Sequence, residues 1–505
     1  MKGVVSSGDK NTTNAAVEIL EAGGNAFDAA CAAMLAAPLS EPMLTSMGEG
    51  GFMMAYSKEN KPRLYDFFVD VPPRRVKEPD FFPIYVDFGT AIQEFHVGAS
   101  SIAIAGMVAG IAKINKDLGS MPLSEIIKPA LRYAKEGIYL SSLQASFVKL
   151  LEPILLSTPE AKKLYTIDGK LIDDKKKVKN LDYATFLEGF AKEGADIFYK
   201  GEIAKKIDEI SKDRGGDIRY EDLQNYKVKI REPLEFKFKN HKVYTNPPPS
   251  AGGILIAFIL ELTEDINAKT PYELEYIKEL IEAMVVASEF RKTHVNPRLH
   301  DSTLYKIIQD NRLINEYKIS KKSRLNLWGN TTHISVIDKF GNSASVTSTN
   351  GEGSGVVVSG YGIMLNNMLG EEDLNPNGFF KWRSGIRLPS MMAPTILEQD
   401  NKLKLSLGSA GSNRIRSAIV EVIQNYINFK MPIQKAIDEP RVHYEKEEVF
   451  FEYSYPKEVI EATKRLYKVT EFKEKSLFFG GVNAVTGDFK AGADPRRGGA
   501  VKIVE

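Results

Sequence analysis

Two alternating runs of polar and apolar residues, joined by a short turn, constrain the fold of this chain more than any other stretch. In residues 332–338, Ile334 and Val336 point to one side and the polar residues between them to the other. This period of two predicts a half-buried strand. A turn around Gly341 follows, and a second alternating run spans residues 343–349. Two strands joined by about five residues predict a β-hairpin.

The expected register of this hairpin brings two threonines together. If the pairing is symmetric about Phe340, Thr349 lies directly opposite Thr331, within side-chain reach. On this stretch alone, two facing threonines fit the ordinary preference of β-branched residues for strands. Only the remainder of the chain can decide between that interpretation and a functional pair.

Length, charge and cysteine content exclude several classes of protein. The chain has 505 residues, well above the usual size of one domain, so it can build several packed layers. The formal net charge of +1 gives no support for a nucleic-acid partner. The single cysteine, Cys31, cannot form an intrachain disulfide, and its alanine neighbours predict a core position rather than a nucleophile.

The sequence gives no sign of secretion or of a membrane segment. Residues 1–5 lack the apolar core of a secretory signal. The longest apolar run, residues 29–39, is too short to cross a bilayer and contains Pro38. We therefore expect a cytoplasmic protein without a membrane partner.

Helices and strands are expected in an irregular order along the chain. A very small-sided helix is predicted at 26–37, amphipathic helices dominate 122–235, and an apolar helix is predicted at 254–262. Strands are expected at 4–5, 52–56, 63–68, 233–243 and 482–485, and a flexible glycine loop at 351–355. The best candidate for a chain break lies just before Thr331, after a polar segment.

Several familiar catalytic patterns are missing. None of the six histidines pairs as H-x-x-x-H, and one cysteine cannot build a thiolate metal cluster. The G-x-S-x-G elbow and the G-x-x-x-x-G-K-[ST] loop are also missing. We therefore expect no metal and no cofactor. The glycine turns and the threonine-rich hairpin fit a mechanism in which backbone amides and a hydroxyl do the chemistry.

The chain resembles the γ-glutamyltransferases (γ-glutamyl transpeptidases) almost from end to end. The resemblance is carried by an ordered set of motifs: Gly23-Gly24-Asn25-Ala26, Glu41-Pro42, the segment Gly48 to Phe52, Pro247 to Gly253, Thr331 to Asp338, Asn366-Asn367, Ala393-Pro394-Thr395 and Ala493-Asp494-Pro495-Arg496. A single one of these motifs would be weak support, whereas the whole series in family order is specific.

This resemblance implies an α+β fold and a precursor that cuts itself. The fold is the four-layer αββα sandwich of the N-terminal nucleophile (Ntn) hydrolases. The cut is expected between Asn330 and Thr331. Residues 1–330 would become a large subunit and 331–505 a small one, and the two would form one folded unit. The sequence leaves open whether such units form a homo-oligomer.

The implied chemistry makes Thr331 both nucleophile and base. Before cleavage its nitrogen is an amide without useful basicity, whereas the freed amine has a pKa near ~8 and can activate its own hydroxyl. By resemblance, the backbone N–H groups of Gly411 and Ser412 stabilise the oxyanion. Thr349 matches a second threonine that supports the nucleophile, and Asn350 stands near the place of a substrate-binding asparagine.

The sequence departs from the family where the acyl donor is recognised. The arginine that grips the donor carboxylate is replaced by Phe68, and a Ser-Ser pair appears as Ser390-Met391. The aspartate that takes the donor ammonium aligns with Glu371, which equally fits a surface acid, and its glutamine neighbour with Met368.

Three functions follow from these observations. The first is a self-processing amidase that cleaves γ-glutamyl amides and passes the acyl group to water or an amine. Arg74 or Arg75 could then compensate for the missing clamp. The second is an acylase or amidohydrolase for another small acyl amide. The third is an unprocessed, inactive member of the family that acts as a binding protein.

Overall fold

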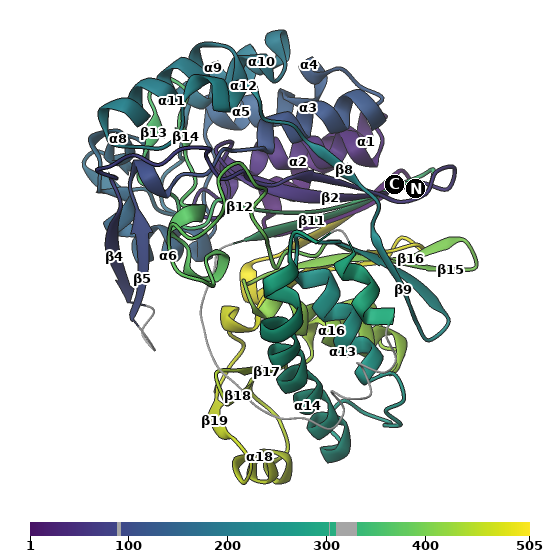
Figure 1. Ribbon diagram of the computed structural model, residues 1–505. Coiled ribbons are helices and arrows are strands. Elements are labelled where there is room, and N and C mark those ends of the chain that lie inside the picture. Colours follow the sequence, from purple (N-terminus) through teal and green to yellow (C-terminus); the bar gives the residue numbers. More distant parts are fainter. Residues whose placement is uncertain (88–91, 302, 310–330) are drawn as a thin grey trace.

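Two antiparallel β-sheets stack at the centre of the molecule, between two layers of helices (Figure 1). The computed structural model describes residues 1–505 except 88–91, 302 and 310–330. The first sheet has the order β22 (Ala500–Val504), β1 (Gly3–Ser7), β11 (Thr332–Asp338), β12 (Ser343–Thr349), β2 (Gly50–Tyr56), β3 (Arg63–Phe67) and β8 (Lys229–Arg231). The second has the order β21 (Ala491–Gly492), β20 (Gly481–Thr486), β16 (Lys402–Ala410), β15 (Thr395–Gln399), β10 (His241–Thr245) and β9 (Leu234–Phe238). The predicted αββα sandwich is confirmed.

The helical layer on the first sheet comes mostly from the first half of the chain. Its longer helices are α1 (Lys10–Glu21), α2 (Ala26–Ser40), α3 (Met107–Leu118), α5 (Lys128–Glu136), α9 (Leu181–Glu193) and α11 (Glu202–Asp213). Helix α2 begins with a capping box between Asn25 and Asp28. Its side chains are mostly small and buried all round, including Cys31, so it can lie close to the sheet. It continues through Pro38 to Ser40, beyond the predicted end at residue 37.

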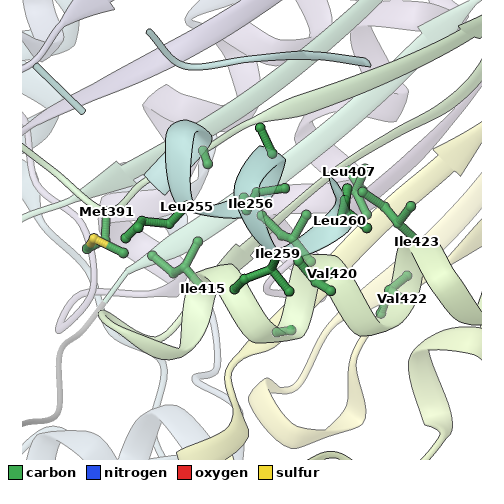
Figure 2. Close-up of a cluster of buried hydrophobic side chains, with 14 of the residues drawn as sticks. Leu255, Ile256, Ile259, Leu260, Met391, Leu407, Ile415, Val420, Val422 and Ile423 are labelled. Carbon is green, nitrogen blue, oxygen red and sulfur yellow. The ribbon is translucent and has the colours of Figure 1, made fainter. Parts of the chain in front are cut away.

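The helical layer on the second sheet is formed by α13 (Gly252–Leu262), α14 (Leu274–Phe290) and α16 (Arg414–Ile427). Helices α13 and α16 face each other through aliphatic side chains, among them Ile259 and Val420 (Figure 2). Burial of each such side chain contributes about 1.5–3 kcal/mol to folding. This packing fixes the first turn of α16, which borders the site described below.

Several smaller elements complete the chain. They are the hairpin β4 (Phe82–Asp87) and β5 (Ile92–Val97), the three-stranded sheet β17 (Val442–Glu445), β18 (Glu448–Phe451) and β19 (Lys468–Glu471), the strand pairs β6 (Thr166–Ile167) with β7 (Lys170–Leu171) and β13 (Val357–Val358) with β14 (Ile363–Met364), and the short helices α4 (Leu123–Ile126), α6 (Ser142–Leu150), α7 (Glu152–Leu155), α8 (Pro159–Tyr165), α10 (Asp196–Tyr199), α12 (Tyr220–Gln224), α17 (Ile433–Asp438) and α18 (Lys457–Lys464). In the part of the chain that the structure describes, no helix is both long and apolar enough to span a bilayer.

Two expectations about local structure were wrong. Strand β11 is buried at all seven positions rather than half-buried, because the second sheet covers one of its faces and helices cover the other. The segment 351–355, expected as a flexible loop, is buried throughout, with its three glycines at positive φ. The expected chain break before Thr331 falls on residues 310–330, outside the described part of the chain.

A polar layer around His333 joins the two sheets. Its Nδ1 lies 2.7 Å from Thr347 Oγ1 and its Nε2 lies 2.9 Å from Ser335 Oγ. The Asn483 side chain of β20 donates to the carbonyl oxygen of His333 at 3.0 Å. Burial lowers the pKa of His333 to about 3, so the ring is neutral and its nitrogens are satisfied by hydroxyl groups. A neutral, fully bonded layer lets polar faces pack between the sheets.

This burial predicts a pH-dependent difference between the wild type and a His333→Gln variant. The unfolded-state histidine binds a proton near pH 6.5, whereas the native one stays neutral down to about pH 3. Wild-type stability therefore falls as pH decreases below 6.5, by up to about 1.4 kcal/mol per pH unit relative to the variant. Urea unfolding at pH 8 gives the baseline difference, and the same measurement at pH 5 should show it shifted in favour of the variant. An equal difference at both pH values would contradict the neutral, buried ring.

Candidate active site

The central hairpin brings the two predicted threonines to the same end of the sheet. Strands β11 and β12 pair with Thr332 opposite Ser348, which is the register predicted from the sequence. One step further along this register places Thr331 opposite Thr349. Both are almost buried, at 5% and 8% exposed. Asn330, the other side of the expected cleavage bond, lies outside the described residues.

Thr349 is the last residue of β12, and its side chain forms a hydrogen bond with the segment that follows. Its Oγ1 accepts a hydrogen bond from the Gly351 N–H at 3.1 Å, and Gly351 takes a positive φ of 64°. A side chain at residue 351 would collide with the Glu371 carboxylate and the Asn367 amide. The turn therefore needs glycine, and it brings Glu371 close to the end of the hairpin.

A buried acid anchors the residue after Thr331. Glu41 accepts hydrogen bonds from Thr332 Oγ1 at 2.6 Å and from Thr12 Oγ1 at 2.8 Å. Burial and the nearby charge of Asp9 raise the pKa of Glu41 to about 7. Because Glu41 holds the Thr332 side chain, the backbone at the start of β11 is fixed, and its direction orients Thr331. Sequence reasoning listed Glu41-Pro42 only as a motif and missed this role.

The loop predicted to stabilise the oxyanion opens helix α16. The carbonyl oxygens of Gly411 and Ser412 accept bonds from the N–H groups of Arg414 and Ile415, at 3.0 and 3.1 Å. In a trans peptide the N–H points opposite to the preceding carbonyl, so the Ser412 N–H points away from the helix. Ser412 directly precedes Asn413, the N-cap of α16, so its N–H lies near the positive end of the helix dipole, which favours negative charge.

Backbone strain is concentrated in this loop. Gly411 has φ 117°, and a Cβ there would lie 2.8 Å from Gly480 Cα. Ser412 also has a positive φ, 51°, which is uncommon for a residue with a side chain. Its hydroxyl donates to the Asp373 carboxylate, and this contact helps to hold the conformation.

Two unpaired acceptors lie beyond Thr349. The Asn350 Oδ1 and one carboxylate oxygen of Glu371 are buried without a hydrogen-bond partner among the described residues. Burial raises the pKa of Glu371, although a hydrogen bond with Glu352 acts in the opposite direction. Glu371 is only 8% exposed, so the interpretation as a surface acid was wrong. Acceptors of this kind suit a bound ammonium or another N–H donor.

The residues that replace the family's carboxylate clamp are buried. Phe68 is 0% exposed and stacks on Phe52, with ring centroids 5.3 Å apart. Met391 is 5% exposed and belongs to the apolar cluster between α13 and α16, beside Leu255 (Figure 2). Ser390 accepts the Met392 N–H at its Oγ, at 3.0 Å, which shapes the same turn. In this structure Phe68 and Met391 are core side chains rather than walls of an open donor pocket.

The two arginines considered as substitutes for the clamp are already engaged. Arg74 pairs with Asp222 and with Glu221, the latter at 2.7 Å. Arg75 pairs with Asp217 at 2.7 Å. The expectation that one of them compensates for the missing clamp therefore has no support in the structure.

Within the described residues no three acidic, histidine or cysteine side chains gather in a way that could hold a metal ion. What the site offers is a threonine at a strand start, backbone N–H groups at a helix N-terminus and buried acceptors. Together with the two stacked sheets, this arrangement defines an Ntn hydrolase.

Comparison with known proteins gives the family. The family described as Gamma-glutamyltranspeptidase matches residues 12–504. The glutathione hydrolase proenzyme of Pseudomonas aeruginosa is 31% identical over 100% of this chain and 95% of its own length. Acylase ACY 1 proenzyme of Pseudomonas sp. strain SE83 is 27% identical over 96% of this chain and 89% of its own. The crystal structure of a cephalosporin acylase from Bacillus halodurans matches with a TM-score of 0.88 at 23% identity, covering 100% of this chain and 96% of that one.

The chain therefore belongs to the γ-glutamyltranspeptidase family of enzymes. The likeness to the solved acylase supports the fold, and the names of the two relatives describe proenzymes with different activities. Membership alone does not select the acyl group.

The strained loop makes a prediction about stability. Gly411→Ala introduces a Cβ at a positive φ and against Gly480, so it should lower the free energy of unfolding by about 1–3 kcal/mol. Ser412→Gly should change it by less than about 1 kcal/mol, because relief of the positive φ offsets the lost bond to Asp373. Thermal denaturation of both variants checks this, and a Gly411→Ala protein as stable as the wild type would contradict it.

Proposed function

We propose that this chain is a self-processing amidase whose nucleophile is Thr331 and whose first candidate substrates are γ-glutamyl amides. The observation that carries the proposal is the hairpin register, which sets Thr331 opposite Thr349 at the end of the central strand. Membership of a family whose relatives are described as proenzymes supports it.

The processing step needs only groups of this chain and water. Thr331 Oγ attacks the carbonyl carbon of Asn330, and the C–N bond breaks as the acyl group moves from nitrogen to oxygen. Water then hydrolyses the ester, which frees the Asn330 carboxylate and the Thr331 amine. The amine has a pKa near ~8 and can take a proton from its own hydroxyl.

Turnover then follows the same atoms. The Thr331 amine takes the Oγ proton while Oγ attacks the amide carbonyl of the substrate. The oxyanion accepts hydrogen bonds from the N–H groups of the Gly411-Ser412 loop. The amine passes the proton to the departing nitrogen, the C–N bond breaks, and an acyl ester remains on Thr331. Water or an acceptor amine attacks this ester by the same route.

A γ-glutamyl acyl group is the first candidate because of the two unpaired acceptors. Asn350 Oδ1 and the Glu371 carboxylate lie beyond the hairpin end, where an α-ammonium could donate to both. Breaking such contacts leaves buried polar groups unpaired, so the ammonium should contribute strongly to selectivity.

A second candidate is an acylase for a different small acyl amide. It is favoured by Phe68 and Met391, which occupy the place of the carboxylate clamp and are buried in the core. A relative of similar identity carries the name acylase, which agrees with this alternative.

Processing gives the first test of the proposal. The purified protein should separate on a denaturing gel into two chains, residues 1–330 and 331–505. Thr331→Ala removes the hydroxyl and should stay intact, whereas Thr185→Ala, on the exposed face of α9, should be cut like the wild type. An intact wild-type chain after long incubation would instead favour the inactive binding protein.

The acyl group is tested with three 4-nitroanilides of equal chain length: γ-glutamyl, 4-aminobutyryl and glutaryl. The glutaryl compound lacks the amine of the γ-glutamyl compound, and the 4-aminobutyryl compound lacks its carboxylate. If Glu371 recognises the ammonium, kcat/KM should fall more for the glutaryl compound. Glu371→Gln should reduce this preference by roughly tenfold or more. A preference for the glutaryl compound would support the second candidate and remove the first.

A further inference from the structure

A cavity of about 860 Å³ lies beside the loop that precedes α16. Its wall includes Asp373 and Asn413, and the Ser412 hydroxyl donates to Asp373. The cavity therefore begins within one residue of the proposed oxyanion loop. Phe68, Ser390 and Met391, the family's donor positions, do not line it.

Two arginines from different helices face this cavity. Arg416, in the first turn of α16, is only 3% exposed. Its terminal nitrogen donates to Ser288 Oγ at 3.1 Å, but its buried Nε has no partner among the described residues. Arg291, just after α14, donates to Asn413 Oδ1 at 2.7 Å, and its Nε is also buried without such a partner. Both arginine side chains thus line one cavity, and each has a buried N–H group without a partner among the described residues.

Positive charge exceeds negative charge among the buried groups here. Arg291, Arg414 and Arg416 are close to Glu445, whose Oε2 lies 3.4 Å from Arg414. Burial would raise the pKa of Glu445, but the hydrogen bond with His443 and the adjacent arginines lower it to about 2, so it is an anion.

The other nearby acid does not balance the remaining arginines. Burial and the charge of Glu445 raise the pKa of Asp373 well above its usual range, which favours the neutral form. The lining also includes Glu94 and Glu372, which are equal in number to the lysines Lys292 and Lys446. Counted over the described residues, the buried part of the cavity therefore keeps a surplus of positive charge.

The position of the arginines in the helix adds to this surplus. Arg414 and Arg416 stand in the first turn of α16, where the helix dipole already favours negative charge and no acidic residue is present. Burial, and after it the charge of Arg291, lower the pKa of Arg416 to about 10, while the charge of Glu445 acts in the opposite direction. A buried charge without its counter-ion is costly, so such a cluster is suited to an anionic ligand.

One wall of the cavity carries two aromatic rings whose planes are tilted by 55° to each other. His96 and Phe379 line it with ring centroids 4.4 Å apart, and Phe81 stacks on His96 at 4.6 Å. A ligand that combines a flat apolar part with an anionic group would contact the rings and the arginines together.

We infer that this cavity binds a carboxylate group of the amide substrate, held by Arg291 and Arg416. The inference rests on the proposed amidase and extends it to the substrate class. The carboxylate can belong to the leaving amine or to the acyl group, since the cavity starts at the loop beside the scissile bond. The chain has lost the family's carboxylate clamp, and this second positive site would restore selection for an anionic substrate at another place.

Binding of reaction-product analogues tests this without any turnover. Isothermal titration calorimetry compares 5-amino-2-nitrobenzoate with 4-nitroaniline for the amine side, and glutarate with butyrate for the acyl side. In one arm the member with the additional carboxylate, 5-amino-2-nitrobenzoate or glutarate, should bind the wild-type protein at least about tenfold more tightly. Arg416→Gln and Arg291→Gln should each remove that preference, and the affected arm identifies the source of the carboxylate.

Two variants make the result decisive. Arg132→Gln removes an arginine that pairs with Glu18 on the surface and should leave binding unchanged. If Arg416→Gln fails to fold by circular dichroism, Arg416→Lys, which keeps the charge, and Arg291→Gln carry the test. No preference in either arm, or an unchanged preference in folded Arg291→Gln, would overturn the inference. If the protein stays unprocessed but still binds the carboxylate compound more tightly, the proposed amidase function is contradicted and the carboxylate site is retained.

Discussion

The hydrogen bonds that hold β11 between β1 and β12 are the constraint on which the rest of the structure depends. They fix the first residue of the central strand, and with it Thr331, against a buried and rigid sheet. Strand β1 comes from the beginning of the chain and β11 from residues after 330, so the proposed cut would leave one sheet shared by two chains. Such a cut would free an amine without loosening the scaffold, because the ladders on both sides of β11 remain.

The proposed catalytic groups and the residues that would select the acyl group are subject to different structural constraints. The proposed catalysis needs a hydroxyl, an amine and backbone N–H groups, all of which the hairpin and the start of α16 can supply. The pocket depends on side chains that can be exchanged without disturbing the sandwich. Phe68 and Met391 fill space in the core, whereas Glu371, Asn350 and the arginine cavity offer unsatisfied polar groups. Catalytic geometry and acyl specificity can therefore diverge within one fold.

The hairpin could be predicted from sequence because its register depends on local alternation and turn length. The fold followed from the ordered motifs of a family resemblance. The burial of β11 could not be predicted from its sequence. The strand alternates like a half-exposed one, yet a polar layer around His333 lets the second sheet cover it. Glu371 looked like a surface acid because two acids follow it in the sequence, yet its carboxylate lies beside Gly351 and is only 8% exposed. That Arg416 and Arg291 line the same cavity depends on the contact of the end of α14 with the start of α16, and no spacing along the chain reveals it.

The central claim is that the Thr331 hydroxyl carries the acyl group during turnover. Acid quenching of the enzyme during steady turnover of a slow amide substrate, followed by proteolysis and mass spectrometry, measures this directly. We predict a peptide that begins at Thr331 and carries the mass of the acyl group as an ester. Turnover with the acyl mass on another residue, or with an uncut bond between residues 330 and 331, would contradict the account.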